Sequence, residues 1–279
     1  MKLKSIILLT LLLASGLLLA QDQGLSLCEK EGEEFGNGLG HDQISFECYE
    51  SFRKAAHTEA IKKSSNEKTL VFGHRNIVFI KQGEKVNIIA GKYTELDEIL
   101  ALAIDESHQE IAVLIKNGDV LFFSSALTGN VAPLRILRNK ELDGSTDLVI
   151  NGKTDEVILF NETNSRLLFF SRLANYSAPE SRKKLNLLRT VKITSTKSSL
   201  SLDQDHQELF LLDSTKMSVQ VHSLEKLVKD SPSLRLDINI TDLKEPTKLE
   251  YSSVKDSIVI SNRIGDQSSL SRLTGIKTK

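Results

Sequence analysis

The sequence predicts an all-β fold, a β-propeller of about five (alternatively four) four-stranded blades, with a short N-terminal helical segment. The first observation is a repeat. The segment "ALAIDESHQEIAVL" returns as "DLVINGKTDEVILF" and "SLSLDQDHQELFLL", with a weaker fourth copy, "KLEYSSVKDSIVIS". Four leucines at matching positions, roughly 50 residues apart, should therefore lie at equivalent places around one axis: Leu102, Leu148, Leu200 and Leu249.

The second observation is the content of each copy. The first holds four short apolar runs, "ALAID", "EIAVLIK", "VLFFSS" and "LRILR", divided by polar residues. Such runs are typical of strands joined by turns, and four antiparallel strands per repeat make one propeller blade. Three further runs before the complete copies and three after them favour five blades. Four blades with surplus edge strands is the alternative.

A recurring Asp or Asn ends the first run of each complete copy, at Asp105, Asn151 and Asp203. Its short side chain can accept hydrogen bonds from backbone N–H groups in a turn. His108 and His206 share one position in these turns, where a polar hairpin tip is favoured over a pair of metal ligands because their blades are not adjacent. A glutamate follows each Asp or Asn by five residues: Glu110, Glu156 and Glu208.

Residues 1–20 predict a signal peptide. A basic start, "MKLK", precedes the apolar run "SIILLTLLLASGLLLA", which ends in a small residue. The run is shorter than the roughly 20 residues of a membrane span, which favours a signal peptide. A retained membrane anchor is the alternative. No later stretch is apolar enough to cross a bilayer. The sequence therefore predicts a periplasmic or secreted protein without a transmembrane segment after signal cleavage.

Residues 21–65 predict a glycine-rich loop followed by a helix. In "QISFECYESFRKAAHTEAIKK", apolar residues recur at spacings of three and four and so share one helix face. Cys28 and Cys48 are an even pair in an exported chain, which indicates a disulfide. The propeller is expected to occupy residues 66–279.

The near-neutral net charge of the chain argues against a nucleic-acid partner. The chain carries a net charge of −1, and the loss of Lys2 and Lys4 with the signal makes it slightly more acidic. A nucleic-acid-binding domain shows a clustered basic excess instead. No nucleic-acid partner is expected.

A family resemblance rests on residues 126–160, "ALTGNVAPLRILRNKELDGSTDLVINGKTDEVILF". A Gly-Asn pair, Ala-Pro, an Arg-containing strand and an Asp-Glu hairpin follow one another there. This order resembles the repeat of bacterial secreted NHL/YncE-like β-propeller proteins, from about Thr69 to Thr274, and departs from it in the third copy, which lacks Gly-Asn. The resemblance implies the fold and brings no catalytic residue.

The sequence predicts no catalytic residue, cofactor or metal site, since His-Glu-x-x-His, Cys-x-x-Cys and Gly-x-Ser-x-Gly are absent from it. The enzymatic alternative is a metal-dependent, gluconolactonase-type lactonase, whose ion lies in the central channel. The inner-strand candidates for such a site are Asp105, Asn151 and Asp203. They recur with the repeat as turn formers, whereas a metal site breaks repeat symmetry.

Binding is expected in the loops that join third and fourth strands, because long loops on a rigid scaffold commonly carry function. The middle loop, "RLANYSAPESRKK", holds the possible partner-binding residues Tyr176, Arg182, Lys183 and Lys184. The function predicted is that of an exported, non-enzymatic binding scaffold in the bacterial envelope, with a protein or an envelope polymer as its partner.

Overall fold

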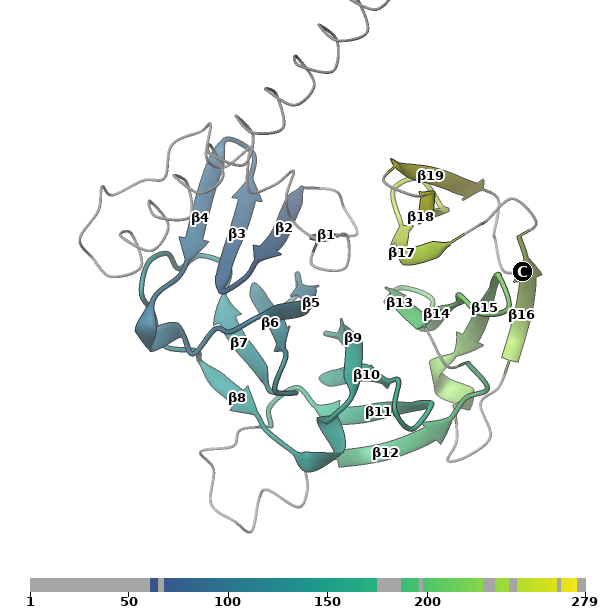
Figure 1. The fold of residues 1–279 in the computed structure, drawn as a ribbon, viewed down its shortest axis with the longest axis horizontal. Helices are drawn as coiled ribbons and strands as arrows, with labels where there is room; N and C mark the ends of the chain where they lie inside the picture. Colours follow the sequence, from purple (N-terminus) through teal and green to yellow (C-terminus); the bar gives the residue numbers. More distant parts are fainter. Residues whose placement is uncertain are drawn as a thin grey trace, which may run out of the picture.

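The fold is a ring of five β-sheets, each of which runs from the centre of the molecule outwards (Figure 1). A computed structural model describes residues 61–64, 68–174, 187–195, 198–227, 234–240, 245–264 and 267–274. In each sheet the first strand in the sequence lies innermost, and the chain then moves outwards strand by strand.

The strands follow in chain order. The first sheet holds β1 (Ile61–Lys63), β2 (Thr69–His74), β3 (Ile77–Gln82) and β4 (Lys85–Ile89). The second holds β5 (Ile99–Asp105), β6 (Glu110–Ile115), β7 (Val120–Ser124) and β8 (Arg135–Leu137). The third holds β9 (Ser145–Asn151), β10 (Glu156–Asn161), β11 (Arg166–Ser171) and β12 (Leu187–Lys192). The fourth holds β13 (Ser198–Asp203), β14 (Glu208–Asp213), β15 (Ser218–Ser223) and β16 (Leu234–Asn239), and the fifth β17 (Pro246–Ser252), β18 (Ser257–Ile264) and β19 (Gln267–Thr274).

The predicted β-propeller is confirmed. Among the described residues, four sheets are complete four-stranded blades, the number given by the alternative, and the fifth sheet has three strands. Every pairing within these sheets is antiparallel, as the repeat requires. The helices in the described part of the chain are single 3-10 turns, η2 (Lys92–Thr94), η3 (Lys140–Leu142) and η4 (Leu224–Lys226).

Strand β1 was not foreseen. The propeller includes Ile61–Lys63, which the sequence assigned to the end of the preceding helix, and this segment pairs with β2. Pairing with β2 outweighs the local helical periodicity, since three residues gain a hydrogen-bonded neighbour in a complete sheet. The rest of the expected helix, the signal peptide, and Cys28 and Cys48 lie outside the described residues.

The hydrophobic core consists of the layers between consecutive sheets. The four matching leucines are completely buried and lie in four different layers: Leu102 packs between the first and second sheets, Leu148 between the second and third, Leu200 between the third and fourth, and Leu249 between the fourth and fifth. Burial of each contributes about 2 kcal/mol. Their equivalent placement confirms that the repeat is a structural module.

The turns between first and second strands use the recurring Asp or Asn as expected. Asp105 Oδ1 accepts hydrogen bonds from the backbone N–H groups of Ser107 (3.1 Å) and His108 (3.2 Å), and Asn151 Oδ1 accepts one from Lys153 (3.1 Å). The same turn is made in the fourth sheet by Asp203. In four of the sheets, the residue just before the second strand adopts a left-handed conformation without being glycine: Gln109, Asp155, Gln207 and Asp256.

No helix in the described part of the chain is long and apolar enough to span a membrane.

Candidate functional site

A cavity of about 270 Å³ lies where the C-terminal ends of the five inner strands meet. Each sheet contributes to its wall through the end of β1, β5, β9, β13 or β17 and the turn that follows. The cavity therefore opens on the face of the first-to-second-strand turns. Its charged lining combines three basic and three acidic side chains: Lys62, Lys63, Lys153, Glu106, Asp203 and Asp205.

A buried polar cluster joins three sheets. It lies on the inner strands just before the residues that line the cavity. Asp147 Oδ2 of β9 accepts hydrogen bonds from the Ser199 hydroxyl (2.8 Å) and the Leu200 N–H (2.8 Å) of β13. The Lys248 ammonium of β17 lies 3.6 Å from Asp147 Oδ1, and the Ser199 hydroxyl oxygen accepts the N–H of Leu249 at 3.2 Å. Asp147, Ser199 and Lys248 are almost completely buried. This cluster fixes the third, fourth and fifth inner strands against one another.

The cluster departs from the symmetry of the repeat. The position just before each matching leucine is Ala101, Asp147, Ser199 or Lys248, so four equivalent places carry four different side chains. The turn-forming Asp and Asn residues keep the repeat, whereas this axial position breaks it. Asymmetry of this kind separates a specific site from the scaffold that carries it.

Lys62 of β1 completes the site from the first sheet. Its side chain crosses the axis, and its ammonium donates a hydrogen bond to the Leu200 carbonyl oxygen at 3.3 Å. The residue is 9% exposed. Burial lowers the pKa of Lys62, and the charge of Lys248 lowers it further, while Asp147 and Glu250 act in the opposite direction. Lys62 therefore holds a proton less firmly than an ordinary lysine.

The rim of the cavity is more exposed and largely paired. Lys153 and Asp205 form an ion pair of 2.8 Å between the third and fourth sheets, and Lys153 lowers the pKa of Asp205. The His206 Nδ1 lies 2.7 Å from Asp203 Oδ2, and this hydrogen bond, with the Asp203 charge, raises the pKa of His206. Burial, followed by Asp203 and Asp256, raises the pKa of Tyr251.

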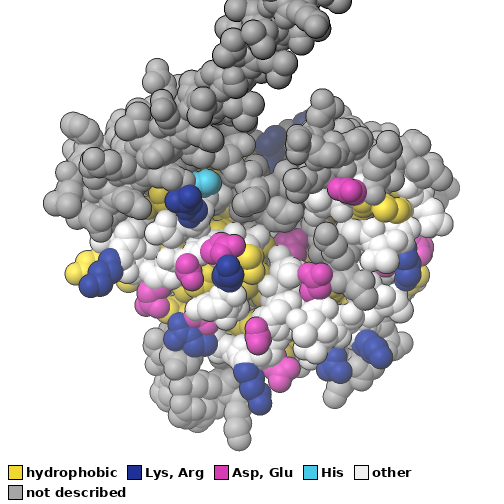
Figure 2. Space-filling model, viewed as in Figure 1, with side chains coloured by type: hydrophobic (Ala, Val, Ile, Leu, Met, Phe, Trp, Pro, Cys, Tyr) yellow, Lys and Arg dark blue, Asp and Glu magenta, His cyan; other side chains and the backbone are white. Residues whose placement is uncertain are grey.

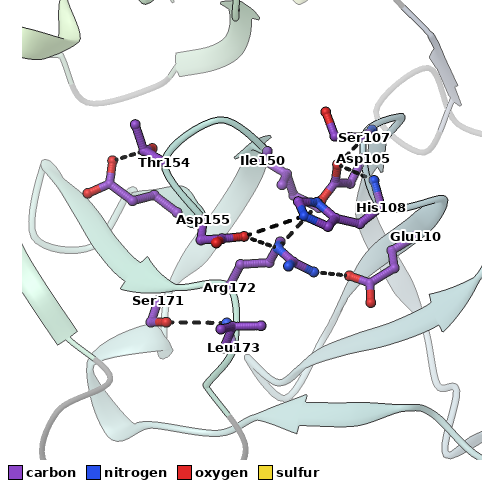
Figure 3. A network of polar contacts seen from close by, with 12 residues as sticks. Asp105, Ser107, His108, Glu110, Ile150, Thr154, Asp155, Ser171, Arg172 and Leu173 are labelled. Atoms are coloured by element: carbon purple, nitrogen blue, oxygen red, sulfur yellow. Dashed lines mark hydrogen bonds and ion pairs between the residues drawn. The ribbon is translucent and has the colours of Figure 1, made fainter.

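A second polar network lies between the second and third sheets (Figure 3). Arg172, which follows β11, donates to Glu110 Oε2 (2.6 Å) and Asp155 Oδ1 (2.8 Å), and its Nε lies 3.6 Å from Asp105 Oδ2. His108 bonds to Asp105 through Nδ1 at 2.9 Å. Arg172 thus faces Glu110 and Asp105 of the second sheet and Asp155 of its own sheet. The network therefore connects the second and third sheets and can be explained by this structural role.

Glu110 is the centre of that network. Burial alone raises the pKa of a carboxyl, but the hydrogen bonds and charges of Arg135 and Arg172 outweigh it and hold the pKa of Glu110 below its ordinary value of 4.5. Glu110 is therefore ionised and fully engaged at neutral pH, which suits an ion pair and not a proton donor.

The residues singled out from the sequence fall into two groups. Tyr176, Arg182, Lys183 and Lys184, proposed as a binding loop, lie outside the described residues. Asp105, Asn151 and Asp203 shape turns, and His108 and His206 each bond to the aspartate of their own turn. In the described part of the chain, no three His, Cys, Asp or Glu side chains come close enough to hold a metal ion.

Lys62 and its axial neighbours were not singled out from the sequence. The available signal was the variation just before the matching leucines, where polar side chains replace alanine on otherwise apolar strands.

On the face shown in Figure 2, acidic and basic side chains of the described residues are interspersed, in agreement with the near-neutral net charge.

Comparison with known proteins adds no relative. No protein-family model matches the chain, and no curated protein matches it in sequence.

Proposed function

We propose that the protein is an exported, non-enzymatic β-propeller that acts as a binding scaffold in the bacterial envelope. One observation carries the proposal: the inner strands of all five sheets converge on a cavity lined by polar side chains, with a buried lysine facing it. Concave sites with a few convergent polar groups are where proteins bind small ligands and chain ends. The partner is a protein or an envelope polymer that presents a small polar group to this cavity.

Export and kinship belong to the same proposal. The basic start and apolar run of residues 1–20 support export. The Asx turn at Asn151 and Arg135 of the fourth strand support kinship with NHL/YncE-like propellers, since both lie in residues 126–160, the motif on which that resemblance rests.

Site-specific photocrosslinking tests where the partner binds. Ser107 lines the cavity and is exposed, whereas Asn164 is exposed in the β10–β11 turn at the opposite end of the strands. Each is replaced in turn by a benzophenone-bearing amino acid, and the full chain is irradiated with envelope extract. Adducts that form from position 107 and not from position 164 are expected. Equal adducts from both positions, or adducts from 164 alone, would contradict an axial binding site.

A second assay distinguishes the binding scaffold from the alternative function, a metal-dependent lactonase. The purified full chain is analysed for bound divalent metal and then supplied with aldonolactones. We expect no turnover above the uncatalysed rate. A stoichiometric metal ion together with lactone hydrolysis that chelation abolishes would replace the scaffold proposal with the enzymatic one.

A further inference from the structure

The Lys62 ammonium has more N–H donors than it uses in the hydrogen bonds of the described residues. An ammonium group has three N–H donors. Among the described residues, Lys62 uses one of them, on the Leu200 carbonyl oxygen. The side chain is nevertheless nine-tenths buried and lines the axial cavity. A buried cation in this position calls for an acceptor that the cavity itself can admit.

The nearest buried carboxylate is already occupied. Asp147 accepts hydrogen bonds from Leu148, Ser199 and Leu200, and it lies 3.6 Å from the Lys248 ammonium. Its charge is therefore matched by Lys248 before Lys62 is counted. Of the charged groups around Lys62, Lys248 repels a cation, and Asp147 and Glu250 attract one. Among the described contacts, neither carboxylate forms an ion pair or hydrogen bond with the Lys62 ammonium, so an anion in the cavity would supply that direct contact.

The rim limits the charge that such an anion can carry. Three acidic side chains line the cavity beside the three lysines, and Lys153 is already paired with Asp205. A doubly charged phosphate would meet the carboxylates of Glu106 and Asp203 as it entered. A single carboxylate needs one cation, and hydroxyl or amide groups behind it could donate to the acids of the rim. The lining therefore favours a monoanion that carries hydrogen-bond donors.

The volume limits its size. About 270 Å³ is slightly below the roughly 300 to 1,000 Å³ of sites for whole small-molecule ligands. The cavity thus fits a compact acid or the last one or two units of a longer chain, whose remainder leaves through the open mouth between the turns.

Resting on the proposed function, the structure assigns a ligand class to this site: we propose that the axial cavity binds a carboxylate, with the Lys62 ammonium as the group that contacts it. The Leu200 carbonyl oxygen holds the Lys62 ammonium, and the rim holds the neutral part of the ligand. The carboxylate belongs either to a small free acid or to the end of a polymer chain.

Pairs of probes that differ only in the carboxylate test this assignment by calorimetry on the full chain. N-acetyl-alanyl-alanine and its C-terminal amide represent a chain end, and gluconate and gluconamide represent a free acid. At least one acid is expected to bind about tenfold or more tightly than its amide. Whichever pair shows the difference identifies the source of the carboxylate. Inorganic phosphate is expected to bind more weakly than that acid.

Two variants locate the contact. Lys62→Met removes the ammonium and keeps the length of the side chain, and it should abolish the preference for acid over amide. Lys116→Met alters an exposed lysine that follows β6 and does not line the cavity, and it should leave the preference within about twofold. Circular dichroism confirms that each variant is folded, and the comparison of acid with amide on the unmodified chain stands even if one is not.

The outcomes separate this inference from the proposed function. Equal binding of acid and amide, absence of binding by both acids, tighter binding of phosphate, or an unchanged preference in folded Lys62→Met would each overturn the carboxylate assignment. Crosslinks from position 107 that persist in those cases would leave the axial scaffold standing. Loss of both results would overturn both proposals.

Discussion

Glu110 of β6 and Arg135 of β8 form a two-point ion pair that spans β7, with an Nη1–Oε1 distance of 2.8 Å and an Nη2–Oε2 distance of 2.5 Å. The guanidinium carbon lies 4.3 Å from the centre of the Phe122 ring on β7. The pairs Glu156–Arg189 and Glu208–Arg235 repeat this arrangement in the third and fourth sheets. The recurring glutamate therefore joins the second strand of a blade to the fourth.

Removal of the Glu110 charge should strongly destabilise the fold. In Glu110→Gln, the guanidinium groups of Arg135 and Arg172 lose their shared carboxylate while Arg172 stays buried. We expect a loss of about 3 kcal/mol in the free energy of unfolding, measured with urea. Glu98→Gln is the matched control, because Glu98 and Lys116 form an exposed pair, and should cost less than about 1 kcal/mol. Equal losses in the two variants would show that the network contributes little.

The same residue predicts a dependence on pH. The pKa of Glu110 is lower in the folded chain than its ordinary value of 4.5, so the ionised form stabilises the fold above that value. The stabilisation is lost as the pH falls through the lower, folded pKa. The difference in unfolding free energy between the unmodified chain and Glu110→Gln should therefore shrink as the pH is lowered from 4.5 through the folded pKa. A difference that is constant over this range contradicts the charge-based explanation.

Asp203 and His206 predict a measurable titration. The carboxylate of Asp203 raises the pKa of His206 above its ordinary value of 6.5, and Asp203→Asn should return it towards that value in an NMR titration. The turn itself should survive, since Asn151 makes the same turn in the third sheet. A raised folded pKa stabilises the fold below pH 6.5 and loses that effect as the pH rises through it. An unchanged pKa of His206 in the variant would remove Asp203 as the cause.

The buried ammonium of Lys62 should lower the free energy of unfolding. Burial and Lys248 lower its pKa, so the folded state holds the proton less firmly than the unfolded chain does, and stability should rise with pH between the folded pKa and 10.5. In Lys62→Met this rise should disappear. The variant should also be about 1 kcal/mol more stable at neutral pH, because an apolar side chain of similar length replaces a buried cation. A loss of stability of about 1 kcal/mol or more would indicate a structural role for Lys62 instead.

The repeat made most of the fold predictable. Leu102 and its three counterparts marked the inner strands, because a leucine that recurs once per blade must meet the same neighbouring layer each time. Asp105 and its counterparts marked the turns through a local hydrogen bond that needs no tertiary information. Strand β1 was missed because three residues carry no periodic signal of their own. Only its pairing with β2 makes it a strand.

The candidate site was far less predictable. Lys62, Asp147, Ser199 and Lys248 lie on four different strands, and only the arrangement of the sheets in a ring brings them together. In the sequence each is an isolated polar residue on an apolar run. The variation just before the matching leucines was visible, but its meaning depends on which side of the inner strands faces the axis. The expected binding loop lies outside the described residues and stays a prediction.

The central claim is that the inner strands of the five sheets build one ligand site on the axis. The decisive test is backbone amide NMR of the isotopically labelled chain during titration with whichever of N-acetyl-alanyl-alanine and gluconate binds more tightly. We expect the largest shifts to cluster at the cavity, in residues from at least four sheets, with Ser64, Ser107, Lys153, Gln204 and Ser253 among them. Shifts confined to a single sheet, or largest at Asn164 and the other turns of the opposite face, would contradict it.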